Sequence, residues 1–240
     1  MATNGTVSNA PELTTWLDRV QTRVSTLRLD AYIFDELRRI VRKNKALQRP
    51  SILYDWLIRQ YAAAIAAGVR RELDEDTRSD SLVRLLRRLK GTAGAVSRER
   101  YRSLYAKHER SLADKSYDKL VGRGRDVPSD SQFDREIRTL KQKTRKLVEY
   151  ADKHIAHVDA TPASSLARFS DVPVALRSLE SAVKRYHHLL KASHLVVGEV
   201  FIQDNWRAVL RVPWIPQPVT SLHNNALHPT GAGDIVSAGG

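Results

Sequence analysis

Apolar residues recur every three or four positions along most of the chain, which is the spacing of amphipathic helices. The pattern predicts helices over the ranges 11–46, 52–73, 82–90, 97–112, 129–159 and 171–198, and a short element over 201–212. No stretch alternates convincingly between apolar and polar residues as a strand would, and no repeat period is present. The predicted fold class is therefore all-α, an antiparallel helical bundle.

Capping and breaking residues predict where these helices begin and end. Pro50 ends the first helix, which is expected to run with or without a break near residues 29–30, and Ser51 is placed to cap the second. Ser79 or Asp80 is expected to cap the helix that starts at residue 82. A neighbouring helix is expected to approach closely over the alanine-rich stretch 61–67.

Two further signals predict helix starts in the second half of the chain. Ser129 is followed three residues later by Gln132, the spacing of a capping box. Pro173 is expected in the first turn of the last long helix, where a missing backbone N–H does no harm.

The two ends of the chain differ in composition from the middle. Residues 1–10 are polar and are expected to be a disordered N-terminus. From residue 213 onward four prolines and four glycines accompany only one charged residue, Asp234, which predicts a disordered C-terminal tail over 213–240. We expect a single helical domain over 11–212.

The charge is strongly positive, +13 with a pI near 10.1, and such a surface attracts polyanions, of which nucleic acid is the leading candidate. Arginine-rich chains from high-GC genomes can carry such a charge without binding anything. The absence of cysteine excludes disulfides and thiolate metal sites. The N-terminus lacks the apolar core of a signal peptide, and the most apolar window, 52–69, contains Asp55 and Arg59. We therefore expect a cytoplasmic protein with no membrane association.

His154 and His157 lie three residues apart and share one side of the predicted 129–159 helix. Three interpretations are open. The pair could bind a metal together with His187, although no Glu-x-x-His ligand motif accompanies it. It could move protons at a phosphodiester, with Lys153 stabilising the phosphate charge. It could also be structural, pairing with Asp152 and Asp159. We expect no metal and no cofactor.

The sequence also resembles a known family. The motif segment is Tyr-Ala-Asp-Lys-His-Ile-Ala-His-Val-Asp, residues 150–159, and an upstream segment is Arg-Arg-Glu-Leu-Asp, residues 70–74, followed by leucines at 82, 85 and 86. Together these segments resemble the HEPN superfamily, nearest to its AbiU2-like group, over residues 13–204. The most specific part is the Lys-x-x-Ala-His-x-Asp core.

The resemblance implies an α-helical, often homodimeric protein of toxin–antitoxin and abortive-infection systems in antiviral defence. It implies a metal-independent endoribonuclease toxin, in whose reaction the 2′-hydroxyl of the RNA itself is the nucleophile. It also implies a neutralising antitoxin as a partner. His157 would be the catalytic acid–base residue. The supporting roles are assigned to catalytic Lys153 and Asp152, to the phosphate-binding residues Arg70, Arg71 and His154, and to Asp159, which would orient the imidazole.

One residue of the family pattern is missing. An RxxxxH-type motif needs an Arg shortly before the His, but that window holds Tyr150, Ala151 and Asp152 before His157, and neither it nor the window before His154 contains Arg. Lys153 lacks the forked donors of Arg. The alternative is therefore a catalytically inactive HEPN fold that binds RNA, a nucleotide or a protein.

Overall fold

The structure is a computed structural model, and it describes residues 10–153, 167–193, 195, 204–212 and 214. The chain divides into two compact units, Met1–Val200 and Phe201–Gly240, which are described separately. The described residues form helices, turns and loops and no strand, so the predicted all-α class is confirmed. None of the described helices is both long enough and apolar enough to cross a bilayer.

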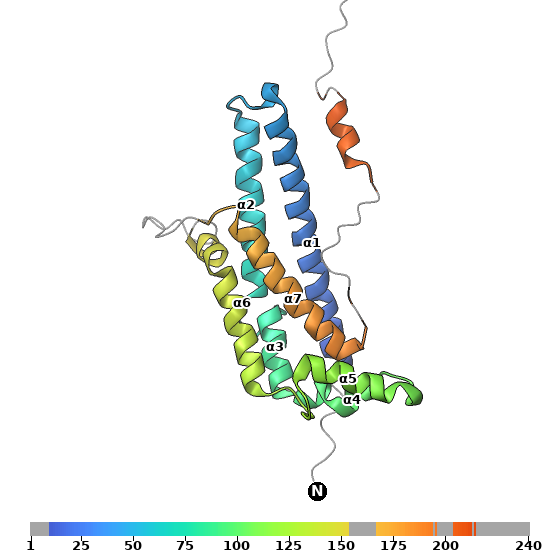
Figure 1. The fold of residues 1–240 in the computed structure, drawn as a ribbon. Coiled ribbons are helices and arrows are strands. Elements are labelled where there is room, and N and C mark those ends of the chain that lie inside the picture. The colour runs from blue at the N-terminus through green and yellow to red at the C-terminus, as the bar shows by residue number, and fades with distance from the viewer. Residues whose placement is uncertain (1–9, 154–166, 194, 196–203, 213, 215–240) are drawn as a thin grey trace, which may run out of the picture. The chain divides into compact units, whose positions relative to one another are not determined.

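The described part of the first unit is built on four long helices that pack side by side (Figure 1). Their apolar faces meet in one core. The four helices are α1 (Ala10–Lys43), α2 (Ile52–Glu72), α6 (Asp130–Ala151) and α7 (Asp171–Lys191). Helix α7 packs against α1 and α6, and α2 packs against α1 and α6. The antiparallel bundle predicted from the periodicity is thus formed by helices far apart in sequence.

Helices α1 and α2 form an antiparallel hairpin. Helix α1 continues without a break past residues 29–30, and the Ser51 hydroxyl accepts a hydrogen bond from the backbone N–H of Tyr54 at the start of α2, as predicted. The two helices approach closely at Gly68, where a Cβ atom would overlap the side chain of Leu27. The small residues of α2 therefore permit the expected close packing.

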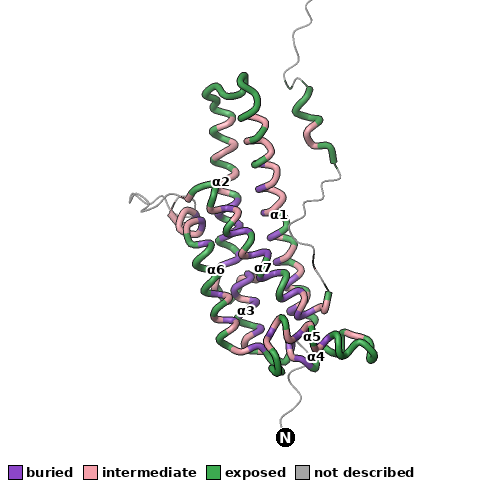
Figure 2. The backbone as a smooth tube through the Cα atoms, in the orientation of Figure 1, coloured by how far each residue is buried: buried purple, intermediate pink, exposed green. Residues whose placement is uncertain are grey.

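The outer half of this hairpin extends away from the core. Figure 2 shows only exposed and intermediate residues along 35–43 of α1 and 52–64 of α2. Large apolar side chains are exposed there at Leu47, Ile52, Leu53 and Trp56, with Ile52 87% exposed. The core lies at the other end of the hairpin, where α6 and α7 cover it.

Helix α3 (Leu82–Gly91) is the short amphipathic helix predicted from its leucine spacing. Leu82, Leu85, Leu86 and Leu89 are completely buried. The predicted cap at Ser79 or Asp80 is wrong, because the hydroxyl of Ser81 accepts the backbone N–H of Arg84 at 3.1 Å. The cap therefore lies directly before Leu82, the first residue of α3.

The helix predicted over 97–112 is wrong. Helix α4 covers only Arg98–Arg102, and a separate helix α5 covers Arg110–Val121. The Arg98 guanidinium donates to carboxylates of Asp114 and Asp118 and to the backbone carbonyl of Arg125. These interactions of Arg98 hold α5 beside α4. The apolar spacing within one segment cannot predict such an arrangement.

Helix α7 has Pro173 in its first turn, as predicted, but ends seven residues earlier than expected. Ala192 adopts a left-handed conformation with φ of 53° and stops the helix after Lys191. In the second unit, the described residues form one 3-10 helix, Trp206–Arg211, and the indole of Trp214 donates to the carbonyl of Val209 at 2.8 Å.

Candidate functional site

Helix α6 carries the motif segment to the edge of the bundle. The predicted capping box at its start is confirmed, because the backbone N–H of Ser129 donates to the Gln132 side chain at 2.8 Å. One face of the helix is buried through Phe133, Leu140 and Leu147. The α-helix ends at Ala151, and the chain continues in a wider helical turn through Asp152 and Lys153. Both of these side chains lie at the surface.

Arg70, near the end of α2, is brought to this turn. Its guanidinium Nε donates to Asp152 Oδ1 in an ion pair whose side chains are each about half exposed, 49% and 47%. The hydrogen bond and the carboxylate charge raise the pKa of Arg70 above its usual value. The structure therefore fixes a permanent cation beside the position five residues before His157.

Arg71 does not join this pair. It lines a groove between α1 and α2 together with Thr26 and Asp30. Successive residues of a helix point about 100° apart, so Arg70 and Arg71 face different neighbours. Of the two arginines that the sequence offered as phosphate contacts, only Arg70 lies at the end of α6.

A pocket of about 210 Å³ lies next to the end of α6. Tyr150 and Leu147 line it from α6, Ile65 lines it from α2, and Arg168 and Phe169 line it from the segment that leads into α7. Ala167, the first described residue after Lys153, also lines this pocket.

Arg168 is the functional candidate that sequence reasoning missed. Its backbone N–H donates to the carboxylate of Asp171 at 2.8 Å, which also accepts from Lys146 at 3.0 Å, so the turn before α7 is held firmly. The only signal in the sequence was a basic residue just before a helix start, and such residues are common. Its position beside Tyr150 depends on the packing of α6 against α7.

The remaining predicted residues, His154, His157 and Asp159, lie outside the described residues. His187, the third ligand of the metal interpretation, is buried between α7 and α1. Its Nδ1 lies 3.2 Å from the Gln21 side chain and its Nε2 lies 3.0 Å from the Ser193 hydroxyl, so both ring nitrogens have protein partners. Within the described part of the chain no cluster of His, Cys, Asp or Glu has the makings of a metal site.

The described helices form an all-α bundle in which an Arg–Asp ion pair lies at the end of α6. An all-α bundle is the fold class expected from the resemblance to the HEPN superfamily. A family model described as AbiU2, within HEPN, matches residues 10–209, and the chain belongs to this family. No curated protein and no solved structure matches the sequence.

Proposed function

We propose that this chain is an abortive-infection defence protein that cleaves RNA with His157 and Arg70. The name of its family points to abortive infection. The observation that carries the catalytic proposal is the ion pair between Arg70 and Asp152. An RxxxxH-type motif would hold its Arg at position 152, and this chain has an Asp there that binds an Arg from α2.

The chemistry follows from what these groups do to a phosphodiester. His157 takes the proton of the ribose 2′-hydroxyl, the 2′-oxygen forms a bond to phosphorus, and the bond from phosphorus to the 5′-oxygen breaks. The departing 5′-oxygen takes up a proton from solvent water, and His157 then releases the proton that it took from the 2′-hydroxyl to solvent. Arg70 and Lys153 stabilise the negative charge that develops on the phosphate, and a guanidinium does so with paired donors. Asp152 holds Arg70 in place.

The products test the proposed chemistry directly. Attack by the 2′-hydroxyl yields a 2′,3′-cyclic phosphate and a 5′-hydroxyl end. An RNA with a single 2′-deoxy nucleotide at the mapped cleavage position should stay intact there, while its other positions are cut. Equal decay of RNA in the wild type and in His157→Ala would refute the proposal.

The second candidate is a HEPN fold that binds RNA without cutting it. The absence of Arg from the window before His157 favours it, and the net charge of +13 is compatible with it. Such a protein would bind RNA with a steep salt dependence that survives His157→Ala. The homodimer and the neutralising partner expected from the resemblance stay predictions.

A further inference from the structure

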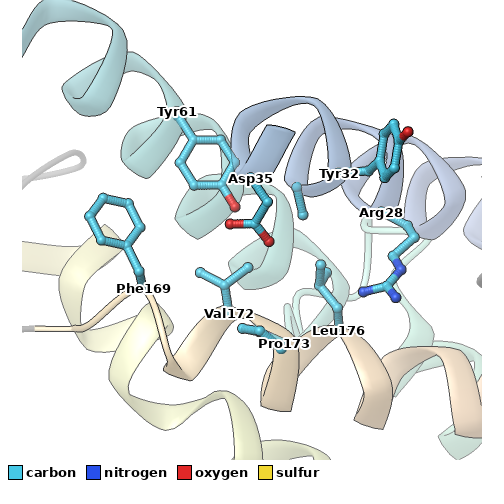
Figure 3. Close-up of a pocket in the computed structure, with 9 residues that line it drawn as sticks. Arg28, Tyr32, Asp35, Tyr61, Phe169, Val172, Pro173 and Leu176 are labelled. Carbon is cyan, nitrogen blue, oxygen red and sulfur yellow. The ribbon is translucent and has the colours of Figure 1, made fainter. Parts of the chain in front are cut away.

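A second pocket, of about 270 Å³, lies where α1, α2 and the start of α7 meet. Figure 3 shows Phe169 and Tyr61 at one end of it, Asp35 near its middle and Arg28 at the other end. Val172 and Leu176 of α7 line its floor. The pocket therefore combines flat aromatic surface, one carboxylate and one guanidinium.

The aromatic end is already assembled. The rings of Phe34 and Tyr61 stack with centroids 3.8 Å apart and an interplanar angle of 9°. The ring centroid of Phe169 lies 5.6 Å from that of Phe34. The guanidinium carbon of Arg38 lies over the Phe169 ring, 4.5 Å from its centroid. Phe169 is nevertheless 37% exposed, so part of its ring is open to contact with a ligand.

The polar side chains of the pocket determine which hydrogen-bond donors and acceptors a ligand needs. A carboxylate only accepts hydrogen bonds and a guanidinium only donates them. Asp35 lies 3.5 Å from Arg38 and is 65% exposed, while Arg28 lies 3.4 Å from Glu180 at the far end of the pocket. Burial and the nearby Asp35 raise the pKa of Tyr61, so its phenol stays protonated and able to donate.

A flat ring with two neighbouring N–H donors fits this arrangement. The Watson–Crick edge of guanine presents N1–H and N2–H side by side, whereas adenine and cytosine present an amino group beside an acceptor, which a carboxylate would repel. Unpaired RNA bases commonly stack on aromatic side chains and are read along this edge. A phosphate attached to the base would suit Arg28.

The pocket is also next to the candidate catalytic site. Tyr61, Phe169 and Val172 line both this pocket and the smaller one beside Tyr150. These three side chains form a shared wall with one pocket on each side. A single strand of RNA that crosses the end of α6 would therefore find a base-sized recess immediately beyond that wall.

We propose that this pocket binds the guanine base of an unpaired RNA nucleotide and so selects where the RNA lies in the site. The inference rests on the proposed function, because it takes RNA as the substrate. A carboxylate that accepts two hydrogen bonds from one base edge gives about tenfold discrimination against other bases. Contact with the exposed part of the Phe169 ring adds affinity for any base.

The test uses the full-length protein and short single-stranded RNAs with uncleavable 2′-O-methyl backbones. Each RNA carries one guanine, adenine or cytosine in an otherwise uridine sequence, and the all-uridine RNA completes the set. We expect the guanine RNA to bind at least about tenfold more tightly than the others. Asp35→Asn should remove this preference, and Asp55→Asn, which changes an exposed carboxylate on α2, should keep it.

Two further measurements complete the test. Phe169→Leu should weaken binding of all four RNAs by about tenfold, because it removes the exposed aromatic contact. Among the free nucleoside monophosphates of the four bases, guanosine monophosphate should bind most tightly. Equal affinity for the four RNAs would overturn the proposal, as would a preference that persists in Asp35→Asn, or a preference shown by the free nucleotides and by none of the RNAs.

The outcome is independent of whether the protein cuts RNA. Guanine preference with no cleavage of natural RNA would keep this pocket and remove the proposed nuclease. Cleavage that depends on His157, with no base preference in binding, would keep the nuclease and remove the pocket.

Discussion

Arg70 on α2 and Asp152 at the end of α6 form an ion pair between residues 82 positions apart in sequence. Asp152 stands where an RxxxxH-type motif would carry its Arg, and the packing of α2 on α6 supplies the guanidinium instead. A guanidinium therefore lies beside Asp152, although the motif window in the sequence contains no Arg. Under the proposed function, this guanidinium takes the role of the motif Arg.

The Arg70–Asp152 pair should contribute little to stability. Both side chains are about half exposed, and exposed ion pairs are worth about 0–1 kcal/mol. Arg70→Ala should therefore unfold within about 1 kcal/mol of the wild type in urea titrations. A much larger loss would mean that Arg70 is a structural residue, and any loss of activity would then say nothing about catalysis.

A buried ion pair elsewhere should behave differently. Glu72 is completely buried and its carboxylate accepts from the guanidinium of Arg23 at 2.5 and 3.2 Å and from the backbone N–H of Leu82 at 3.2 Å. Arg23→Leu leaves a buried carboxylate without its cation and should cost about 3–5 kcal/mol. Adding Glu72→Gln should recover part of this loss, and the free energies of unfolding of the single and double variants measure it.

His187 should make stability depend on pH. Burial, and then the nearby ammonium group of Lys191, lower the pKa of His187 below its ordinary value near 6.5. The unfolded chain then binds this proton more readily than the folded chain, so the stabilisation is fully present above pH 6.5 and is lost as the pH falls through that value.

Urea titrations at several pH values between 5 and 8 measure this effect. The wild type should lose stability toward pH 5 more steeply than His187→Gln, which has no imidazole at this position. Identical slopes for the two proteins would show that the His187 ring does not titrate differently in the folded and unfolded chains.

The contact between α1 and α2 should tolerate no side chain at Gly68. A Cβ there overlaps Leu27, so Gly68→Val should lower the free energy of unfolding by about 1–3 kcal/mol through overpacking. Ala67→Val, one residue earlier on the exposed side of α2, should change it by no more than about 0.5 kcal/mol. Similar values for both variants would contradict the close approach of the two helices.

The long helices could be predicted because each carries a local signal. Apolar spacing in α6, the cap at Ser51 and the proline at Pro173 all act within a few residues. The break between α4 and α5 could not be predicted, since it depends on the reach of Arg98 to Asp114 and Asp118. Interactions between distant segments leave no periodic trace in the sequence.

The same distinction holds for the site. The motif at the end of α6 could be found from adjacent residues, and Lys153 and Asp152 follow from it. Which of Arg70 and Arg71 would reach that end depends on the rotation of α2 about its axis. Arg168 and the pocket beside Tyr150 depend on how α7 packs against α6. These were beyond prediction because they are properties of packing.

The most direct measurement is single-turnover RNA cleavage by charge variants of the pair, with Arg71→Ala as a control on the other side of α2. Arg70→Ala should slow cleavage by about a hundredfold or more, and His157→Ala by at least as much. The exchange Arg70→Asp with Asp152→Arg restores a guanidinium at the end of α6 and should recover most of the rate. Full activity in Arg70→Ala, or no recovery in the exchanged variant when it is as stable as the wild type, would contradict the central claim that Arg70 supplies the missing cation.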